Sequence, residues 1–309
     1  MTPRLARRLR VVLFGAAVLG TLIGVSNLVL HLTSDPLADV HAYYDAGARL
    51  NAGLPLYDQP ADTNAAAFYR YPPLLAIAFR PLALLPFGVA AAVWEAVLVG
   101  SFAFALRRIG WRRPATWLAA GILAMPIAWS LTIGQAQVLV TALLTVGSPW
   151  AVGLAGNLKL LPVLAAVYWL GRREWPALGR FAGWVAGLAF VQLVLEPRGT
   201  LAFLSFPSLA QVGEVTNLSP YGTAPVLWLV LVVAGGLLAL RLAPTRYGWA
   251  AAVALSVLAS PRLLAYQLST LLAGLASPGR EPVAERRTTI RRGTGAVPDE
   301  HGSIAASRP

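Results

Sequence analysis

Apolar runs long enough, or almost long enough, to cross a bilayer recur along most of this chain. The first covers residues 11–32, and a helix needs about 20 apolar residues to span the hydrocarbon core. Only 12% of the 309 residues are charged and the mean hydropathy is +0.63, whereas about 25% of the residues in a soluble domain are charged. The pattern predicts an all-α integral membrane protein.

Ten such runs can be counted, and several are short enough to be tilted or broken helices. They cover residues 11–32, 74–86, 87–106, 114–133, 135–147, 150–170, 181–195, 222–242, 247–259 and 263–276. We therefore expect a polytopic bundle of about ten transmembrane helices as one membrane-embedded domain, residues 1–276. Residues 277–309 are rich in Gly, Ser, Pro and Arg, which predicts a disordered basic cytoplasmic tail.

The arginines suggest how the chain is oriented in the membrane. A cluster from Arg4 to Arg10 precedes the first run, which is longer than the apolar part of a cleaved signal peptide. We therefore expect a retained first helix with a cytoplasmic N-terminus. Ten spans then return the tail to the cytoplasm but leave the cluster Arg107–Arg113 outside. If residues 74–86 were re-entrant, this cluster would be inside and the tail outside.

Composition also excludes several classes of site and partner. The chain has no cysteine and three histidines, so it offers no disulfide framework and no thiolate metal site. No glycine-rich nucleotide loop or metal-ligand spacing is present, and we expect neither a cofactor nor a metal. The arginines behind the net charge of +12 sit at helix ends and in the tail. That placement favours membrane lipids over nucleic acid as the partner.

The segment between the first two runs, residues 33–73, is too long and too patterned for a simple connector. It holds five of the 13 acidic residues, and the orientation above makes it a large extracytoplasmic loop. A carboxylate beside a cavity that excludes water can act as general base for a sugar hydroxyl. Asp39 is the leading candidate for that role, and the alternative is a solvated loop acid.

Three cations are candidates for contacting an anionic group. Lys159 lies inside an apolar run, where a cation costs roughly 2.5–3.5 kcal/mol; the alternatives are snorkelling to an interface or an ion pair with Glu95. Arg262 follows Pro261, and its guanidinium can grip two phosphate oxygens; the alternative is a positive residue at a helix end. Arg70 precedes the Tyr71-Pro72-Pro73 segment. Glu95 is an intramembrane acid, for which function and a buried ion pair are both open.

Several short motifs occur in one order between Asp39 and Gln267. They read DVHAYYDAG from Asp39, NAGLPLYD from Asn51, YPP from Tyr71, PLALLP from Pro81, GQAQ from Gly134, GLAGNLKLLP from Gly153, and SP from Ser260. Together they resemble the signatures D-x-x-x-Y-Y-x-A, G-x-x-L-Y-D, Y-P-P, P-L-A-L-L-P, G-Q-x-N, G-x-x-x-x-x-K-x-x-P and S-P of glycosyltransferase family 87. That family belongs to the GT-C superfamily and is typified by polyprenol-phosphate-mannose-dependent α-mannosyltransferases.

The resemblance implies a GT-C type enzyme of a bacterial plasma membrane. It would move a sugar, most simply mannose, from a polyprenyl-phosphate donor to a glycolipid or glycan hydroxyl on the extracytoplasmic side. It implies inversion in a single displacement with Asp39 as base and no metal. It also implies substrate contacts by Tyr43, Tyr44 and Gln135 in the matching motifs.

Two departures from the family pattern keep other functions open. The chain is short, and where many members carry an aromatic residue and a histidine after S-P, this sequence has Tyr266, our substitute for that contact. An inactive relative acting as an assembly subunit fits these departures. A transporter for lipids or lipid-linked sugars fits ten spans with Glu95 and Lys159 inside the membrane. Loss of Asp39 should abolish a transferase and spare a transporter.

Overall fold

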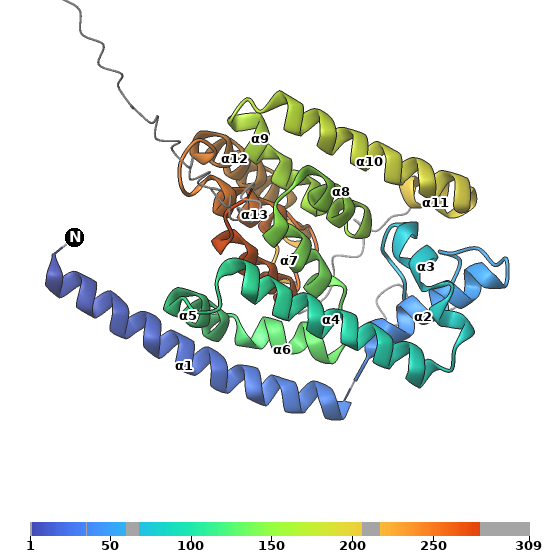
Figure 1. Ribbon diagram of the computed structural model, residues 1–309, viewed down its shortest axis with the longest axis horizontal. Coiled ribbons are helices and arrows are strands. Elements are labelled where there is room, and N and C mark those ends of the chain that lie inside the picture. Colours follow the sequence, from blue (N-terminus) through green and yellow to red (C-terminus); the bar gives the residue numbers. More distant parts are fainter. Residues whose placement is uncertain (1, 35, 60–67, 206–216, 279–309) are drawn as a thin grey trace, which may run out of the picture. The chain divides into compact units, whose positions relative to one another are not determined.

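The structure is a computed structural model that describes residues 2–34, 36–59, 68–205 and 217–278, and these ranges contain helices and no strand. Figure 1 shows their arrangement. The α-helices are α1 (Pro3–Ser34), α2 (Ala38–Asn51), α3 (Pro73–Phe79), α4 (Phe87–Ile109), α5 (Pro114–Ile122), α6 (Ala124–Thr132), α7 (Gln137–Val146), α8 (Pro149–Leu158), α9 (Val167–Gly171), α10 (Trp175–Leu195), α11 (Pro197–Ser205), α12 (Pro225–Leu242) and α13 (Gly248–Leu258). The 3₁₀ helices are η1 (Leu82–Leu84), η2 (Leu161–Ala166), η3 (Pro220–Gly222) and η4 (Ala265–Leu275).

Among the described residues, four helices are long and apolar enough to cross a membrane: α1, α4, α10 and α12. The pair α5 and α6 makes a fifth if its 69° bend counts as one broken span. The long helices carry large apolar side chains on their outer faces, such as Val226 at 74% exposure. Apolar surface on this scale requires a lipid environment. The prediction of a helical membrane protein is confirmed.

The expected number of about ten spans is not found among the described residues. The runs 74–86, 135–147, 150–170, 247–259 and 263–276 form helices of 11 residues or fewer, some of them 3₁₀. Glycine and proline lie within or beside these runs. Proline cannot donate the helical hydrogen bond and glycine permits a sharp turn, so helices tend to end at these residues. Irregular backbone at membrane depth is tolerated where it lines a cavity. These short elements surround the site described below.

The segment 33–73 is also more regular than a loop. Its first half forms α2, a 14-residue helix with one face buried against the rest of the molecule. Residues 35 and 60–67 lie outside the described residues, and so does the predicted tail from residue 279 onward. The disorder of that tail therefore stays a prediction.

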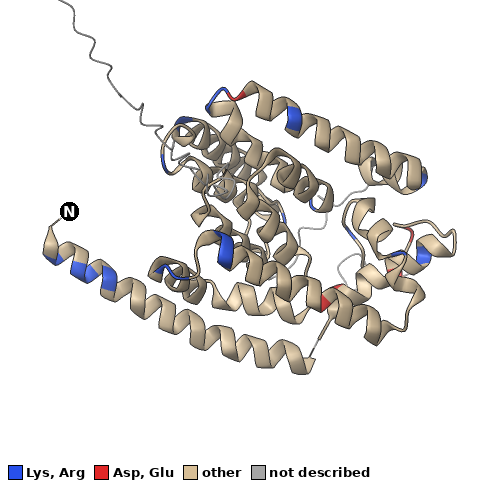
Figure 2. Ribbon diagram, in the orientation of Figure 1, with Lys and Arg blue, Asp and Glu red and all other residues tan. Residues whose placement is uncertain are grey.

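The charges follow the helix ends, as Figure 2 shows. Basic residues occupy the start of α1 and the last turn of α4, where Arg107 and Arg108 lie. Cations there interact favourably with the helix dipole as well as with lipid headgroups. Among the described residues, Arg70, Lys159 and Arg262 line one pocket instead.

The turn between α6 and α7 holds α2 in place. The backbone N–H of Leu37 donates to the carbonyl of Thr132 and that of Asp39 to Ile133, both over 3.0 Å. Gly134 follows with φ +71°, and a Cβ there would lie 2.0 Å from a methyl of Val40. Glycine is therefore required at this position, and its absence of a side chain brings the start of α2 against the start of α7.

Candidate active site

Asp39 sits in the first turn of α2 and is 8% exposed. An acid in a first turn is stabilised by the helix dipole and the free N–H groups there. Its carboxylate accepts one hydrogen bond, from the Tyr71 hydroxyl at 3.4 Å to Oδ1. Among the described residues, no ion pair joins Asp39 to a basic side chain. The predicted base is thus buried without being neutralised by direct contact with a cation.

Burial and charge act on Asp39 in opposite directions. Burial raises the pKa of Asp39 to about 6, and the positive charges of Lys159, Arg70 and Arg262 and the Tyr71 hydrogen bond partly offset that rise. A catalytic base works best with a pKa near the working pH. A carboxyl whose pKa is shifted this way is suited to accept a proton from a hydroxyl at neutral pH, and such shifts mark functional-site candidates.

Lys159 lies where the run 150–170 breaks. It follows α8 in an extended conformation (φ −143°, ψ 122°), and Pro162 prevents a straight continuation of the helix. Its ammonium donates to Gln137 Oε1 at 2.8 Å. It also lies 4.9 Å from the ring centroid of Tyr71 and 5.2 Å from that of Tyr266. Two cation–π contacts offset part of the cost of burying the charge.

This geometry argues against the two alternative roles of Lys159. Lys159 points into a polar site, so it does not snorkel to an interface, and no ion pair with Glu95 forms within the described chain. Glu95 instead lies half-buried on α4, near Gly134, where an added Cβ would be 2.8 Å from its Oε1. Burial lowers the pKa of Lys159, the negative charge of Asp39 raises it, and the positive charge of Arg262 lowers it. The net shift is downward because desolvation outweighs the attraction of the carboxylate.

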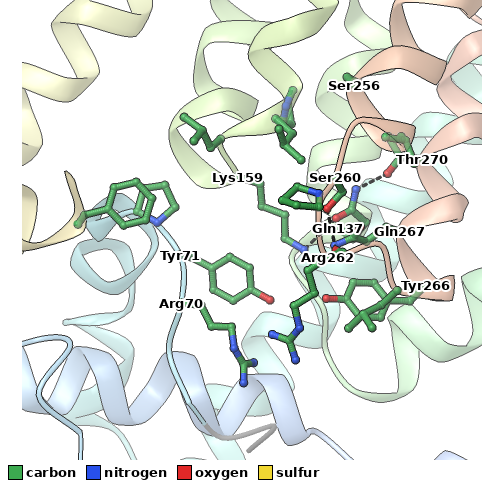
Figure 3. A pocket seen from close by; sticks show the side chains of 18 residues that line it. Arg70, Tyr71, Gln137, Lys159, Ser256, Ser260, Arg262, Tyr266, Gln267 and Thr270 are labelled. Atoms are coloured by element: carbon green, nitrogen blue, oxygen red, sulfur yellow. Dashed lines mark hydrogen bonds between the residues drawn. The ribbon is translucent and has the colours of Figure 1, made fainter. Parts of the chain in front are cut away.

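A pocket of about 200 Å³ opens beside this cluster. Figure 3 shows Arg70, Lys159 and Arg262 converging on it together with Tyr71 and Tyr266. Its lining divides by chemistry into polar and apolar side chains. The apolar lining consists of Pro72, Leu160, Leu161, Pro162, Phe203, Val257, Pro261 and Leu264. A ligand that combines an anionic group with a hydrocarbon part matches this division.

The three predicted cations and Tyr266 are therefore brought together, although 192 positions separate Arg70 from Arg262 along the chain. Arg70 comes from the segment before α3, Lys159 from the break after α8, and Arg262 from the loop between α13 and η4. Helix α13 ends at Leu258, and Pro261 follows in the loop that carries Arg262 to the pocket. The positive charge of all three lowers the pKa of Asp39.

Tyr43 and Gln135 lie beneath the pocket and are fully buried. The Tyr43 hydroxyl donates to Gln135 Oε1 at 2.7 Å and accepts from the backbone N–H of Ala136 at 3.2 Å. Neither residue lines the pocket. They support Tyr71, because Gln135 Nε2 donates to the Tyr71 hydroxyl at 3.0 Å.

Tyr44 is not brought into the site. It follows Tyr43 on α2, so it points about 100° around the helix from its neighbour. Its hydroxyl donates to the carbonyl of Leu85 at 2.7 Å and its ring meets Phe87 edge-on. This tyrosine ties α2 to the start of α4.

Sequence reasoning missed three residues that build the site. Tyr71 contacts both Asp39 and Lys159. Gln137 accepts a hydrogen bond from the Lys159 ammonium. Thr270 of η4 holds Gln137 in place by accepting a hydrogen bond from its Nε2 at 2.6 Å. Tyr71 begins the YPP motif and Gln137 ends the GQAQ motif, so the motifs marked both positions without indicating a role. Thr270 carries no local signal.

Within the described ranges no three His, Asp or Glu side chains gather as metal ligands would. The expectation that the site uses neither metal nor cofactor stays a prediction.

The fold and the site together define a class. This is a helical membrane protein with a buried carboxylate near a pocket that is lined by cationic and apolar side chains. Comparison with known proteins agrees with that class. Glycosyltransferase family 87 matches residues 68–278, and the chain belongs to this family, which confirms the resemblance. The matched range begins after Asp39, so the role of Asp39 rests on its geometry.

Two curated relatives are similar to this chain. One is a polyprenol-phosphate-mannose-dependent alpha-(1-2)-phosphatidylinositol pentamannoside mannosyltransferase of Mycolicibacterium smegmatis, 35% identical over 206 residues, 60% of this chain and 49% of the relative. The other has the same name, comes from Mycobacterium tuberculosis, and is 31% identical over 209 residues, 60% of this chain and 47% of the relative. The chain spans about half the length of these relatives. No solved structure matches it.

Proposed function

We propose that this protein is a bacterial membrane glycosyltransferase of the GT-C type that transfers mannose from a polyprenyl-phosphate donor to a hydroxyl of a glycolipid. The reaction takes place on the extracytoplasmic side of the plasma membrane. The observation that carries the proposal is Asp39, which is buried, has no ion pair among the described residues, and lies beside a pocket lined by three cations. Family membership and the printed names of the two relatives support the choice of donor.

Each part of the pocket matches one part of such a donor. Arg262, Lys159 and Arg70 bind the phosphate, with the guanidinium of Arg262 able to hold two oxygens. The apolar lining accommodates the first isoprenoid units. The amide of Gln267, which lines the pocket, is available to the sugar. The acceptor is a phosphatidylinositol mannoside or a related glycolipid.

The chemistry is a single displacement. Asp39 accepts the proton of the acceptor hydroxyl while that oxygen attacks the anomeric carbon, and the bond from this carbon to the phosphate oxygen breaks. The bonding electrons leave with the polyprenyl phosphate. The phosphate departs as a stabilised anion and needs no general acid, because the cations hold its charge as it develops. Inversion at the anomeric carbon follows from the single displacement.

The decisive experiment uses the purified full chain with polyprenyl-phosphate-mannose and a membrane lipid extract. A new glycolipid, heavier by one hexose in its mass spectrum, is the expected product, and Asp39→Asn should not form it. Absence of product from wild type with every lipid-linked sugar tried would contradict the proposal. Transport of a lipid-linked sugar by both wild type and Asp39→Asn would identify a transporter instead. Restored transfer only when a partner protein is added would identify an assembly subunit.

A further inference from the structure

Tyr71 contacts both the carboxylate and the ammonium of the site. Its hydroxyl lies 3.4 Å from Asp39 Oδ1, and the face of its ring lies toward the Lys159 ammonium, 4.9 Å from the centroid. It also lines the pocket, as Figure 3 shows, whereas Asp39 does not. One side chain therefore contacts both charged groups.

The hydroxyl of Tyr71 is oriented by its neighbours. Gln135 Nε2 donates to the Tyr71 oxygen at 3.0 Å, so the tyrosine must send its own proton elsewhere. Two acceptors are in range, Asp39 Oδ1 at 3.4 Å and Gln135 Oε1 at 3.3 Å. Gln135 Oε1 already accepts from Tyr43 at 2.7 Å. Asp39 is therefore the better acceptor for the hydroxyl proton of Tyr71.

The ring and backbone of Tyr71 are held as firmly as its hydroxyl. Its ring packs edge-on against Tyr43 and Tyr69, with centroids 5.4 Å and 5.7 Å away. Its carbonyl accepts from the Tyr57 hydroxyl at 2.7 Å. Pro72 and Pro73 follow directly and fix the backbone that enters α3. A side chain whose ring, hydroxyl and backbone are all held in place can keep two other groups at a set separation.

We infer that Tyr71 is a positioning residue that keeps Asp39 and Lys159 from forming a direct ion pair, so that the carboxylate remains available as a base. A salt bridge would make the carboxylate a weaker base toward the hydroxyl of the acceptor substrate. It would also draw the ammonium away from the phosphate. The ring of Tyr71 blocks this contact while its hydroxyl stabilises the ionised carboxylate. This inference rests on the proposed function for its purpose, but not for its test.

The groups that act on Asp39 come from several elements. They are Lys159 at the break after α8, Arg70 and Tyr71 before α3, Arg262 before η4, Tyr43 on α2 and Tyr266 on η4. Glu95 on α4 lies near Gly134. Replacing Tyr71 alone removes none of these other groups, so a change in the titration of Asp39 reports on the loss of Tyr71.

Two replacements of Tyr71 should shift the titration of Asp39 in opposite directions. Tyr71→Phe keeps the ring as a barrier and removes the hydrogen bond, so protonation of Asp39 should move to higher pH, by about one unit. Tyr71→Leu removes the barrier, admits water and lets Lys159 reach the carboxylate, so protonation should move to lower pH. Tyr168→Phe, outside the pocket and packed edge-on against Trp249, is the control and should change nothing.

The titration is read from the infrared carboxyl band of the purified full chain in detergent, after subtraction of the same variant with Asp39→Asn added. The acid limb of kcat should move by the same amount in each variant. An unchanged midpoint in Tyr71→Phe, or shifts of the same sign in Tyr71→Phe and Tyr71→Leu, would overturn the inference. If Tyr71→Leu does not fold, the Tyr71→Phe arm still decides. Wild type without transferase activity would refute the proposed function and leave the infrared test intact.

Discussion

Asp39 shows how one residue acquires chemistry from its surroundings. Burial disfavours its charged form, while three nearby cations favour it, and the balance leaves a carboxyl that titrates close to neutral pH. The same side chain in a solvated loop would titrate near 3.8 and would be a weak base. The predictions at this scale concern what Asp39, Lys159 and Arg262 each supply.

Replacement of Asp39 by Asn should remove the base and leave the fold intact. Turnover should fall about 10²–10⁴-fold, measured as mannose transferred per minute at saturating donor. Thermal stability in detergent should be no lower, since a buried carboxylate is being replaced by a neutral amide. Asp45→Asn, at an exposed position on α2, is the matched control. Near-normal turnover of Asp39→Asn would remove Asp39 from the mechanism.

The pH dependence of turnover should reflect the raised pKa of Asp39. The base must be ionised to act, so kcat should be full above this pKa and should decline as the pH falls through about 6. An unperturbed aspartate would place the decline near 3.8. The measurement is kcat in wild type from about pH 4 to pH 8 at saturating donor. A decline below pH 5 would contradict the burial effect on Asp39.

Arg262 and Lys159 should differ in what their loss does to the donor. Arg262→Lys keeps the charge but loses the paired hydrogen bonds, so the donor KM should rise while the acceptor KM changes little. We expect Arg262 to contribute more than Lys159 to donor binding, because only a guanidinium grips two oxygens. If Lys159→Ala abolishes donor binding while Arg262→Lys and Arg262→Ala leave it unchanged, the order is reversed.

At the scale of elements, the site depends on where helices stop. Lys159 faces the pocket because α8 ends there, and Arg262 does so because Pro261 follows the end of α13. Asp39 is placed by the turn between α6 and α7, to which the start of α2 is hydrogen-bonded. Continuous transmembrane helices would keep their backbone groups paired but could not direct these side chains into one cavity.

Gly134→Ala should disturb that turn. Alanine disfavours a φ of +71°, and its Cβ would lie 2.0 Å from a Val40 methyl, so α2 must shift. We expect a loss of about 1–3 kcal/mol of stability and a fall in turnover, read from thermal unfolding in detergent and the transfer assay. Gly88→Ala on α4, where nothing lies within 4 Å, should be neutral or slightly stabilising. Equal stability of the two variants would contradict the role of Gly134.

At the scale of the whole molecule, α1 sets which side of the membrane the site faces. Its 32 residues extend about 48 Å, more than the roughly 30 Å core of a bilayer. The N-terminus and α2 therefore belong on opposite sides. The positive-inside rule predicts a cytoplasmic N-terminus, so we expect α2 and Asp39 on the extracytoplasmic side.

Single cysteines can test this orientation without background, because the chain has none. Leu54→Cys, in the exposed turn after α2, should react with an impermeant maleimide added to intact cells. Thr2→Cys should react only after permeabilisation. Labelling of both from outside would break the proposed orientation. Asn64 and Thr288 would be the corresponding positions by sequence alone, but they lie outside the described residues.

Local patterns of the sequence were enough to determine the class of protein and most of the candidate residues. Apolar runs define helices in a membrane, and a charge such as Lys159 inside such a run stands out because burying it is costly. Proline and glycine mark where helices break. Each of these signals depends on neighbours along the chain. They marked Arg70, Lys159 and Arg262 as candidates, and the resemblance to the family added Tyr266 and favoured Asp39 as the base. The structure places Arg70, Lys159, Arg262 and Tyr266 around one pocket.

Only the tertiary structure decided how these residues work together, because that depends on contacts between distant positions. Tyr71 meets Asp39 across 32 positions and Gln137 meets Thr270 across 133. The direction of a side chain around its helix separated Tyr43, which supports the site, from Tyr44, which does not. The count of spans failed for the same reason, since an apolar run can be a membrane helix or the lining of a pocket. Hydropathy does not distinguish them; packing does.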